Sequence, residues 1–139
     1  MKLLSIVFSF KNEEKNIPEL VNRTIKTISN FNNWKYEIIF VNDCSDDRSE
    51  ELLLEFQKKY PITIINMSRT FGVAPCVLAG FRRAKGDAII YFDADLQDPP
   101  ELMAELIKEF ENGSEVVHTV RTKRLGESKI RLILTSIAY

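Results

Sequence analysis

Five short apolar runs, separated by longer segments with helical spacing, constrain the fold of this chain more than any other feature. The runs are rich in β-branched and aromatic residues, and several are apolar throughout, which is typical of strands buried on both faces of a parallel sheet. They cover residues 3–8, 36–41, 62–66, 88–92 and 115–120. Parallel strands need crossover helices between them. The pattern therefore predicts an α/β fold, an open three-layer sandwich with a mostly parallel sheet.

The first and fourth segments between these runs carry the clearest helical signals. Apolar residues recur at helical spacing across residues 17–28, and again in a segment that begins at Pro99 and Pro100. Proline is favoured in a first helical turn because the amide hydrogen that it lacks would have no partner there. Gly113 is expected to end the fourth helix, since glycine readily adopts a left-handed backbone.

The second and third segments also predict helices. Apolar residues at 52–56 mark the second helix, with Ser45 or Asp46 as its expected N-cap. Pro75 suits the first turn of the third helix. The side chains expected to be buried by that third helix are Val77, Leu78 and Phe81.

Length and composition limit the chain to one domain, residues 1–139. Its 139 residues are 45% apolar and 28% charged, as in ordinary soluble globular proteins. A net charge of -1 gives no general support for nucleic-acid binding, so no nucleic-acid partner is expected. Cys44 and Cys76 show no metal-binding spacing, which favours a reducing, cytoplasmic setting.

The hydropathy of the chain and its C-terminal residues predict a soluble piece of a longer protein. No stretch reaches the roughly 18 to 20 consecutive apolar residues that a membrane span requires. The segment 128–139 stops inside an apolar pattern, without the glycine or polar tail that usually closes a helix. We therefore interpret the chain as truncated at its C-terminal end.

An acidic cluster directly follows the fourth apolar run, where parallel sheets commonly bind ligands. Asp93 and Asp95 are two residues apart, so in an extended strand end both carboxylates would face one side, which Gln97 continues. Two carboxylates and an amide oxygen suit Mg²⁺ or Mn²⁺, ions that often share ligation with substrate phosphates. The alternative is a solvated loop with Asp98 capping the next helix, although capping does not require both other aspartates.

Three further charged residues follow other apolar runs. Asp43 could accept hydrogen bonds from a base or a ribose hydroxyl, or it could be a turn residue that bonds its own backbone. Glu13 could play a similar role, or it could supply a favourable charge at a helix N-terminus. Arg121 could bind phosphate oxygens through its guanidinium group, or belong to a solvated basic face.

Other functions remain open on this evidence. A phosphatase with an aspartate nucleophile can also carry two aspartates around one residue, but usually after the first strand and not the fourth. A nucleotide-sugar-binding module without transfer activity would keep the same fold and the same acidic site. A dinucleotide-binding domain is disfavoured, because no G-x-G-x-x-G motif follows the first run.

Taken together, these motifs resemble the inverting family 2 glycosyltransferases with a GT-A fold, which is Rossmann-like. The likeness is greatest to the polyprenyl-phosphate glycosyltransferases, the group of dolichol-phosphate mannosyltransferase and undecaprenyl-phosphate glucosyltransferase. It extends over essentially the whole chain. The segments that carry it are GDAIIYFDADLQDPPELM (86–103), SIVFSFKNEEKNI (5–17), IIFVNDCSDD (38–47), SRTFGVAPCVLAGF (68–81) and VVHTVRTKRLGES (116–128).

The resemblance implies roles for individual residues. Asp93, Asp95 and Gln97 would bind Mg²⁺ or Mn²⁺ together with the donor diphosphate, and Arg121 would also meet the diphosphate. Asp93, Asp95 and Arg121 would thus be the catalytic residues. The residues implied to bind the nucleotide are Ser9, Glu13, Val41, Asp43, Ala94 and Gln97. Ser9 departs from the family pattern, which usually has proline at this position.

The resemblance also implies a reaction and its partners. A sugar would move from a nucleotide-sugar, with UDP-sugars favoured over GDP-sugars, to a polyprenyl phosphate at the membrane surface, with inversion at the anomeric carbon. A saccharide hydroxyl is the alternative acceptor. The full-length protein would lie on the cytoplasmic side of the cell membrane in a pathway of cell-wall or lipid-linked glycan synthesis. A homo-oligomer is left open.

An apolar face near the C-terminus fits this location. Ile130, Ile133, Leu134 and Ile137 recur at helical spacing, with basic residues beside them. Such a helix can lie on a membrane surface. An ordinary core helix explains the same pattern equally well.

Overall fold

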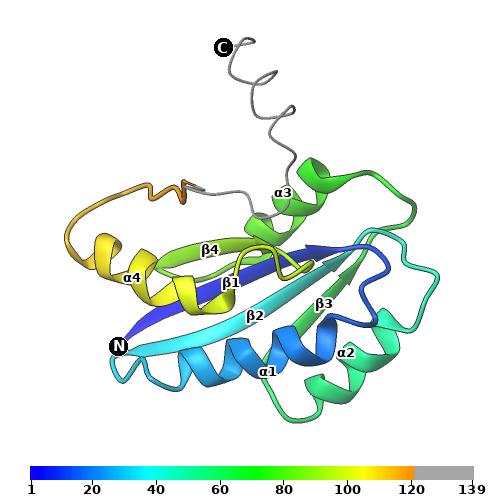
Figure 1. Ribbon diagram of the computed structural model, residues 1–139. Coiled ribbons are helices and arrows are strands. Elements are labelled where there is room, and N and C mark those ends of the chain that lie inside the picture. Colours follow the sequence, from blue (N-terminus) through cyan, green and yellow to red (C-terminus); the bar gives the residue numbers. More distant parts are fainter. Residues whose placement is uncertain (121–139) are drawn as a thin grey trace, which may run out of the picture.

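The computed structural model describes residues 1–120, which form a four-stranded, entirely parallel sheet covered by helices (Figure 1). The strand order is β3-β2-β1-β4, so the first strand lies in the middle of the sheet. The parallel sheet and the alternation of strands and helices confirm the predicted fold class. The strands are β1 (Lys2–Phe10), β2 (Trp34–Asn42), β3 (Ile62–Asn66) and β4 (Ala88–Asp93).

Helices cover both faces of the sheet and complete three layers (Figure 1). Apolar side chains of three helices pack with one face of the sheet in the larger core cluster. The third helix in chain order packs against β1 and β2 on the other face. The helices are α1 (Ile17–Ile28), α2 (Ser49–Gln57), α3 (Val73–Arg83), the 3₁₀ turn η1 (Pro100–Leu102) and α4 (Met103–Glu111).

The larger core explains why β1 is apolar at nearly every position. Alternate residues such as Leu4, Ile6 and Phe8 are fully buried beneath α1, α2 and α4. The intervening residue Val7 is also fully buried, but on the face that α3 covers. A strand whose side chains are removed from water on both faces must be apolar throughout, as the sequence indicated.

The predicted boundaries of the first and fourth helices are confirmed. α1 spans Ile17–Ile28 and buries the apolar stripe read from its sequence. The fourth helical segment opens with η1 at Pro100 and continues as α4. Gly113, at φ 101°, has the expected left-handed backbone, and its amide donates to the carbonyl of Phe110 at 3.0 Å.

The face by which α3 contacts the sheet was predicted wrongly for two of the three side chains, while the third, Val77, is half-buried. Leu78 and Phe81 are 58% and 42% exposed, whereas Cys76 and Gly80 are buried. Residues 76 and 80 share one helix face, and Leu78 lies roughly 200° around the helix from Cys76. Gly80 must face the sheet because a Cβ there would stand 2.3 Å from Cγ1 of Val7.

The predicted cap of α2 is also wrong. The helix begins at Ser49, whose amide donates to Oδ1 of Asp47 at 2.9 Å. Arg48 occupies the N-cap position without a side-chain cap hydrogen bond, and Ser45 and Asp46 lie in the loop before it. Both are bonded to Asn12 in the loop that follows β1, Ser45 through its hydroxyl and Asp46 through its backbone amide.

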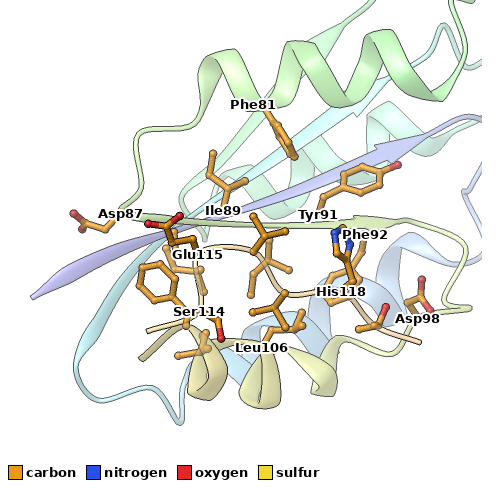
Figure 2. Close-up of a pocket in the computed structure, with 18 residues that line it drawn as sticks. Phe81, Asp87, Ile89, Tyr91, Phe92, Asp98, Leu106, Ser114, Glu115 and His118 are labelled. Carbon is orange, nitrogen blue, oxygen red and sulfur yellow. The ribbon is translucent and has the colours of Figure 1, made fainter. Parts of the chain in front are cut away.

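The fifth predicted strand, residues 115–120, is not a strand. Val116 and Val120 are 72% and 83% exposed, and the segment forms no ladder with β4, although both line one cavity (Figure 2). β-Branched residues favour an extended backbone, but a strand also needs a partner for its amide and carbonyl groups.

Within residues 1–120, no helix has the length and apolar character needed to cross a membrane.

Candidate functional site

The candidate site lies at the carboxyl edge of the sheet, where the loops after β1, β2 and β4 emerge side by side. Ser9, near the end of β1, is in register with Val41 of β2 and with Asp93 of β4. Because the three strands are parallel neighbours, residues far apart in sequence reach the same edge. Open α/β sheets bind ligands in this position.

The loops after β1 and β2 are tied together through their backbones. Oγ of Ser45 accepts the amide of Asn12 at 2.9 Å, and Oδ1 of Asn12 accepts the amide of Asp46 at 3.0 Å. Oγ of Ser49 accepts the amide of Glu13 at 2.8 Å. These bonds satisfy amides that would otherwise need water, and they join the two loops into one wall of the candidate site.

Unusual backbone conformations mark the same three loops. Among the described residues, the non-glycine residues with positive φ are Asn12 at 57°, Cys44 at 60° and Leu96 at 61°. They follow β1, β2 and β4 respectively. Left-handed backbone is unfavourable for most side chains and clusters at functional sites, where the surrounding structure enforces it. The sequence pattern gave no indication of these conformations.

Asp43 holds the loop that precedes α3. Its two carboxylate oxygens accept the amides of Phe71, at 2.7 Å, and Gly72, at 2.9 Å, and the side chain is buried. Burial alone would raise the pKa of Asp43, but the backbone hydrogen bonds and the charge of Lys11 outweigh it. The pKa therefore lies below its ordinary value of 3.8. Asp43 therefore holds the loop of Phe71 and Gly72 in place, and we call this interaction the clamp.

Two neighbours of Asp43 were not among the predicted site residues. Nζ of Lys11 donates to Oγ1 of Thr70 at 2.8 Å, which brings a positive charge near the carboxylate of Asp43. Cys76 lies on the buried face of α3, and burial, followed by the charge of Asp43, raises its pKa to about 11. The only hint in the sequence was the position of Lys11 directly after an apolar run.

Asp93 ends β4 and is held by two hydroxyl groups. Oδ1 of Asp93 accepts a hydrogen bond from the hydroxyl of Tyr91 and another from Oγ of Ser9 at 3.2 Å. The two hydroxyl oxygens are themselves 2.7 Å apart. Burial, together with the negative charge and hydrogen bond of Asp93, raises the pKa of Tyr91 well above its ordinary range.

Asp95 lies in a turn beyond the strand, so the predicted alternation of side chains does not place it. β4 ends at Asp93, and residues 94–98 form turns and bends. Oδ1 of Asp95 accepts the amide of Gln97 at 2.9 Å, an interaction that stabilises this turn. The expectation that strand geometry aligns Asp93, Asp95 and Gln97 is therefore corrected, while all three remain in one short loop.

The donor atoms of this loop are of the type that binds a divalent ion together with a ligand. Among residues 1–120, no group of three or more histidine, cysteine, aspartate or glutamate side chains is arranged to hold a metal ion. Asp93 and Asp95 would contribute two carboxylates, and a bound diphosphate and waters would supply the remaining oxygens. Mg²⁺ is commonly held in this manner.

The other predicted nucleotide-binding residues have mixed positions. Glu13 is half-buried, and its carboxylate accepts the side-chain amide of Asn16 at 2.6 Å. The side chains of Val41 and Ala94 are buried in the two core clusters, so a nucleotide would meet the main chain at these positions. Arg121 lies outside the described residues.

A largely apolar cavity of about 590 Å³ lies along β4, between α3 and α4 (Figure 2). Phe81 reaches it from α3, Leu106 from α4, and Ile89 and Tyr91 from the strand itself. Asp93 and Asp95 do not line this cavity, whereas Asp98 of the same acidic loop does. Tyr91 also lines the cavity, and its hydroxyl contacts Asp93.

Comparison with known proteins adds relatives that match most of this chain. Over 136 residues it is 47% identical to the uncharacterized glycosyltransferase YkcC of Bacillus subtilis, which covers 97% of this chain and 42% of the relative. It is 38% identical to the undecaprenyl-phosphate 4-deoxy-4-formamido-L-arabinose transferase of Pseudomonas savastanoi, covering 89% and 37%. The chain thus spans less than half the length of these relatives.

Solved structures share the fold. The mannosyltransferase PcManGT from Pyrobaculum calidifontis, in complex with GDP-Man and Mn²⁺, matches with a TM-score of 0.66 and 19% identity, over 82% of this chain and 33% of that one. S. aureus TarS 1-349 in complex with UDP-GlcNAc matches with a TM-score of 0.61 and 21% identity, over 88% and 39%. At these identities the likeness establishes the GT-A fold alone.

The sequence also matches a family over nearly its whole length. Residues 5–135 match the family described as Glycosyl transferase family 2. That span includes the four described strands almost entirely, together with the loops after β1, β2 and β4 that build the candidate site. This chain is therefore a member of glycosyltransferase family 2.

Proposed function

We propose that the protein transfers a sugar from a nucleotide-sugar to a polyprenyl phosphate, with inversion at the anomeric carbon. The observation that carries this proposal is the pair Asp93 and Asp95, at the carboxyl edge of the sheet in a family 2 glycosyltransferase. A relative named as an undecaprenyl-phosphate sugar transferase supports the lipid phosphate as acceptor. The alternative acceptor, a saccharide hydroxyl, lacks such support among these relatives.

The donor would bind across the loops at this edge. Asp93, Asp95 and Gln97 would hold Mg²⁺ or Mn²⁺ and the diphosphate, with Arg121 adding a positive charge. The nucleoside would lie toward Glu13, Asp43 and the main chain at Ser9, Val41 and Ala94. Solved relatives with bound UDP-GlcNAc and GDP-Man support a nucleotide-sugar in general. Of the two nucleosides, uridine and guanosine, we propose uridine.

The chemistry requires little proton transfer. An oxygen of the acceptor phosphate forms a bond to the anomeric carbon, the bond from that carbon to the donor diphosphate breaks, and the nucleoside diphosphate leaves with the electron pair. The acceptor phosphate is already ionised at neutral pH, so no strong general base is needed. A divalent ion, when bound, would stabilise the charge of the leaving diphosphate. A hydroxyl acceptor would instead need a carboxylate base.

The acceptor places the whole protein at a membrane. Polyprenyl phosphates are anchored in the bilayer by their chains, so transfer must occur at its surface. We propose that the longer protein works on the cytoplasmic side, where nucleotide-sugars are made. Because the present chain spans less than half of its relatives, donor binding is the function to test in it.

Calorimetric titration with UDP and GDP, in Mn²⁺ or in excess chelator, tests this proposal. UDP should bind only weakly in chelator, because its diphosphate would otherwise lie beside uncompensated carboxylates. Asp95→Asn keeps the shape of the side chain but removes its charge, and it should weaken Mn²⁺-dependent binding by at least roughly tenfold, about 1.4 kcal/mol. Its melting temperature should stay close to wild type.

Asp46→Asn is the matched control, since Asp46 is an exposed aspartate of the neighbouring loop. This variant should bind UDP as wild type does. Equal UDP affinity in Mn²⁺ and in chelator would remove the metal from the proposal. Equal UDP affinity of wild type and Asp95→Asn in Mn²⁺ would indicate that the acidic loop is merely solvated and binds no metal ion.

A further inference from the structure

Two hydroxyl groups converge on one oxygen of Asp93. The hydroxyl of Tyr91 donates to Oδ1, and Oγ of Ser9 lies 3.2 Å from the same atom and 2.7 Å from the hydroxyl oxygen of Tyr91. Ser9 comes from β1 and the other two from β4, so the cluster bridges neighbouring strands. We propose that Tyr91, assisted by Ser9, is a positioning residue that orients Asp93 toward the bound metal and diphosphate. This inference rests on the proposed function.

The number of protons in the cluster shows that at least one hydroxyl group must donate a hydrogen bond to the carboxylate of Asp93. Three oxygen–oxygen contacts are shared by two hydroxyl groups, each of which carries one proton. An ionised carboxylate can only accept. Three arrangements use the two protons: both hydroxyl groups donate to Oδ1, or Ser9 donates to Tyr91 and Tyr91 to Oδ1, or Tyr91 donates to Ser9 and Ser9 to Oδ1. At least one hydroxyl donates to Oδ1 in each arrangement, and the contact between Tyr91 and Asp93, the shortest of the three, favours Tyr91 as that donor.

Packing holds Tyr91 in the orientation that this bond requires. Its ring is half-buried against the core cluster beneath α3, and Phe81 contacts it edge to face, with ring centroids 6.5 Å apart. Figure 2 shows Phe81 reaching from α3 toward the strand that carries Tyr91. Ser9 is only 6% exposed. Side chains locked in this manner keep a ligand-binding group in place before the ligand arrives.

The arrangement also leaves one side of the carboxylate for a ligand. Within the described part of the chain, the hydrogen bonds to the side chain of Asp93 all reach Oδ1, and the residue itself is exposed. Oδ2 therefore lies outside the hydroxyl cluster. Groups that orient a metal-binding side chain typically contribute 10- to 100-fold to metal affinity, which sets the expected size of the effect.

Tyr91→Phe tests the proposal, because it removes the hydroxyl and keeps the ring that packs on Phe81. We expect the apparent affinity for Mn²⁺, titrated calorimetrically at fixed UDP, to fall by about tenfold. UDP affinity in excess chelator should stay unchanged. Tyr36→Phe is the matched control, a half-buried tyrosine of β2 that packs against the larger core. It should bind Mn²⁺ and UDP as wild type does.

A double-variant cycle separates positioning from other roles. If Tyr91 acts through Asp93, then Tyr91→Phe added to Asp93→Asn should cause no further loss of Mn²⁺-dependent binding. If the hydroxyl contacts the ligand itself, the two losses should multiply. Ser9→Ala should show a smaller loss with the same dependence on Asp93. Melting temperatures of all variants, measured without ligand, identify any effect that comes only from reduced stability.

The outcomes distinguish this inference from the function beneath it. Mn²⁺-dependent binding of UDP by wild type, with Tyr91→Phe binding equally or more tightly, would overturn the positioning role and leave the proposed function standing. Losses that multiply in the double variant would also overturn it. Absence of Mn²⁺-dependent binding in wild type would overturn the proposed function, and the positioning role with it.

Discussion

Replacing Asp43 with asparagine should weaken the fold through the loop that precedes α3. The carboxylate is buried and accepts the amides of Phe71 and Gly72, one on each oxygen. Asparagine has nearly the same shape, but it offers a single acceptor oxygen. Its NH₂ group would point a donor at one of the two backbone donors. One hydrogen bond should therefore be lost outright, and the other should become a neutral one.

The size of the effect follows from these two bonds. A hydrogen bond to a charged group contributes about 1.5–3 kcal/mol, and a neutral one about 0.5–1.5 kcal/mol. Burial of the charge opposes part of this contribution. Phe71 is an exposed residue, and we expect water to replace part of what is lost. We therefore expect Asp43→Asn to lower the free energy of unfolding by roughly 2–3 kcal/mol at neutral pH.

The effect should depend on pH in a defined direction. The pKa of Asp43 is lowered in the folded state, below the ordinary 3.8 that applies when the chain is unfolded. Its stabilisation is therefore fully present above that ordinary value and is lost as pH falls through the lowered folded value. The difference between wild type and Asp43→Asn should accordingly be constant from pH 7 to about pH 5 and shrink below about pH 3.8.

Urea unfolding followed by the fluorescence of Trp34 would measure this difference, since Trp34 is the single tryptophan and is 6% exposed. Asp46→Asn, on the exposed part of the same loop, is the control and should change stability by less than about 0.5 kcal/mol. A loss below about 0.5 kcal/mol for Asp43→Asn would refute the clamp. A loss equal at pH 3 and pH 7 would refute the role of its charge.

Two further predictions concern α3 and the cysteines. Gly80→Ala should lower the free energy of unfolding by up to about 2 kcal/mol in the same assay, because overpacking against Val7 costs about 1–3 kcal/mol and the gain in helix propensity offsets roughly 1 kcal/mol of it. A more stable variant would contradict the close approach of helix and sheet. Cys44 is exposed and Cys76 is buried with a raised pKa, so iodoacetamide at pH 8 should label Cys44 alone, and Cys76 only in denaturant. Mass spectrometry of peptides decides this, and equal labelling of both in the folded protein would be evidence against the buried position of Cys76.

Most of the fold could be predicted because its signals are local. The apolar runs of the central strands β1 and β2 are largely buried on both faces, and those of the edge strands β3 and β4 are partly buried, so the composition of each run indicates a strand directly. The apolar stripe of α1 and the glycine after α4 are equally local signals. Where neighbouring residues alone determine an element, sequence pattern is sufficient.

The errors occurred where a distant contact decides the outcome. Residues 115–120 have the composition of a strand, yet within the described chain they have no partner strand to pair with. The orientation of α3 depends on the absence of a side chain at Gly80, which lets the helix approach Val7. Ser45 and Asp46 bond to Asn12 in the loop after β1 and do not cap α2. None of these three outcomes can be read from the spacing of apolar residues.

The candidate site shows the same division between location and arrangement. The rule that ligands bind beyond parallel strands was enough to select the loop of Asp93 and Asp95. It could not reveal that Tyr91 donates to Asp93, because a tyrosine in a β-rich run looks like a packing residue. Its hydroxyl acquires a role only when the register of β1 and β4 brings Ser9 beside Asp93. Strand register thus brings Tyr91 and Ser9 to the candidate site, and variants of these two residues, and not of the acidic residues alone, would distinguish a built binding site from a solvated loop.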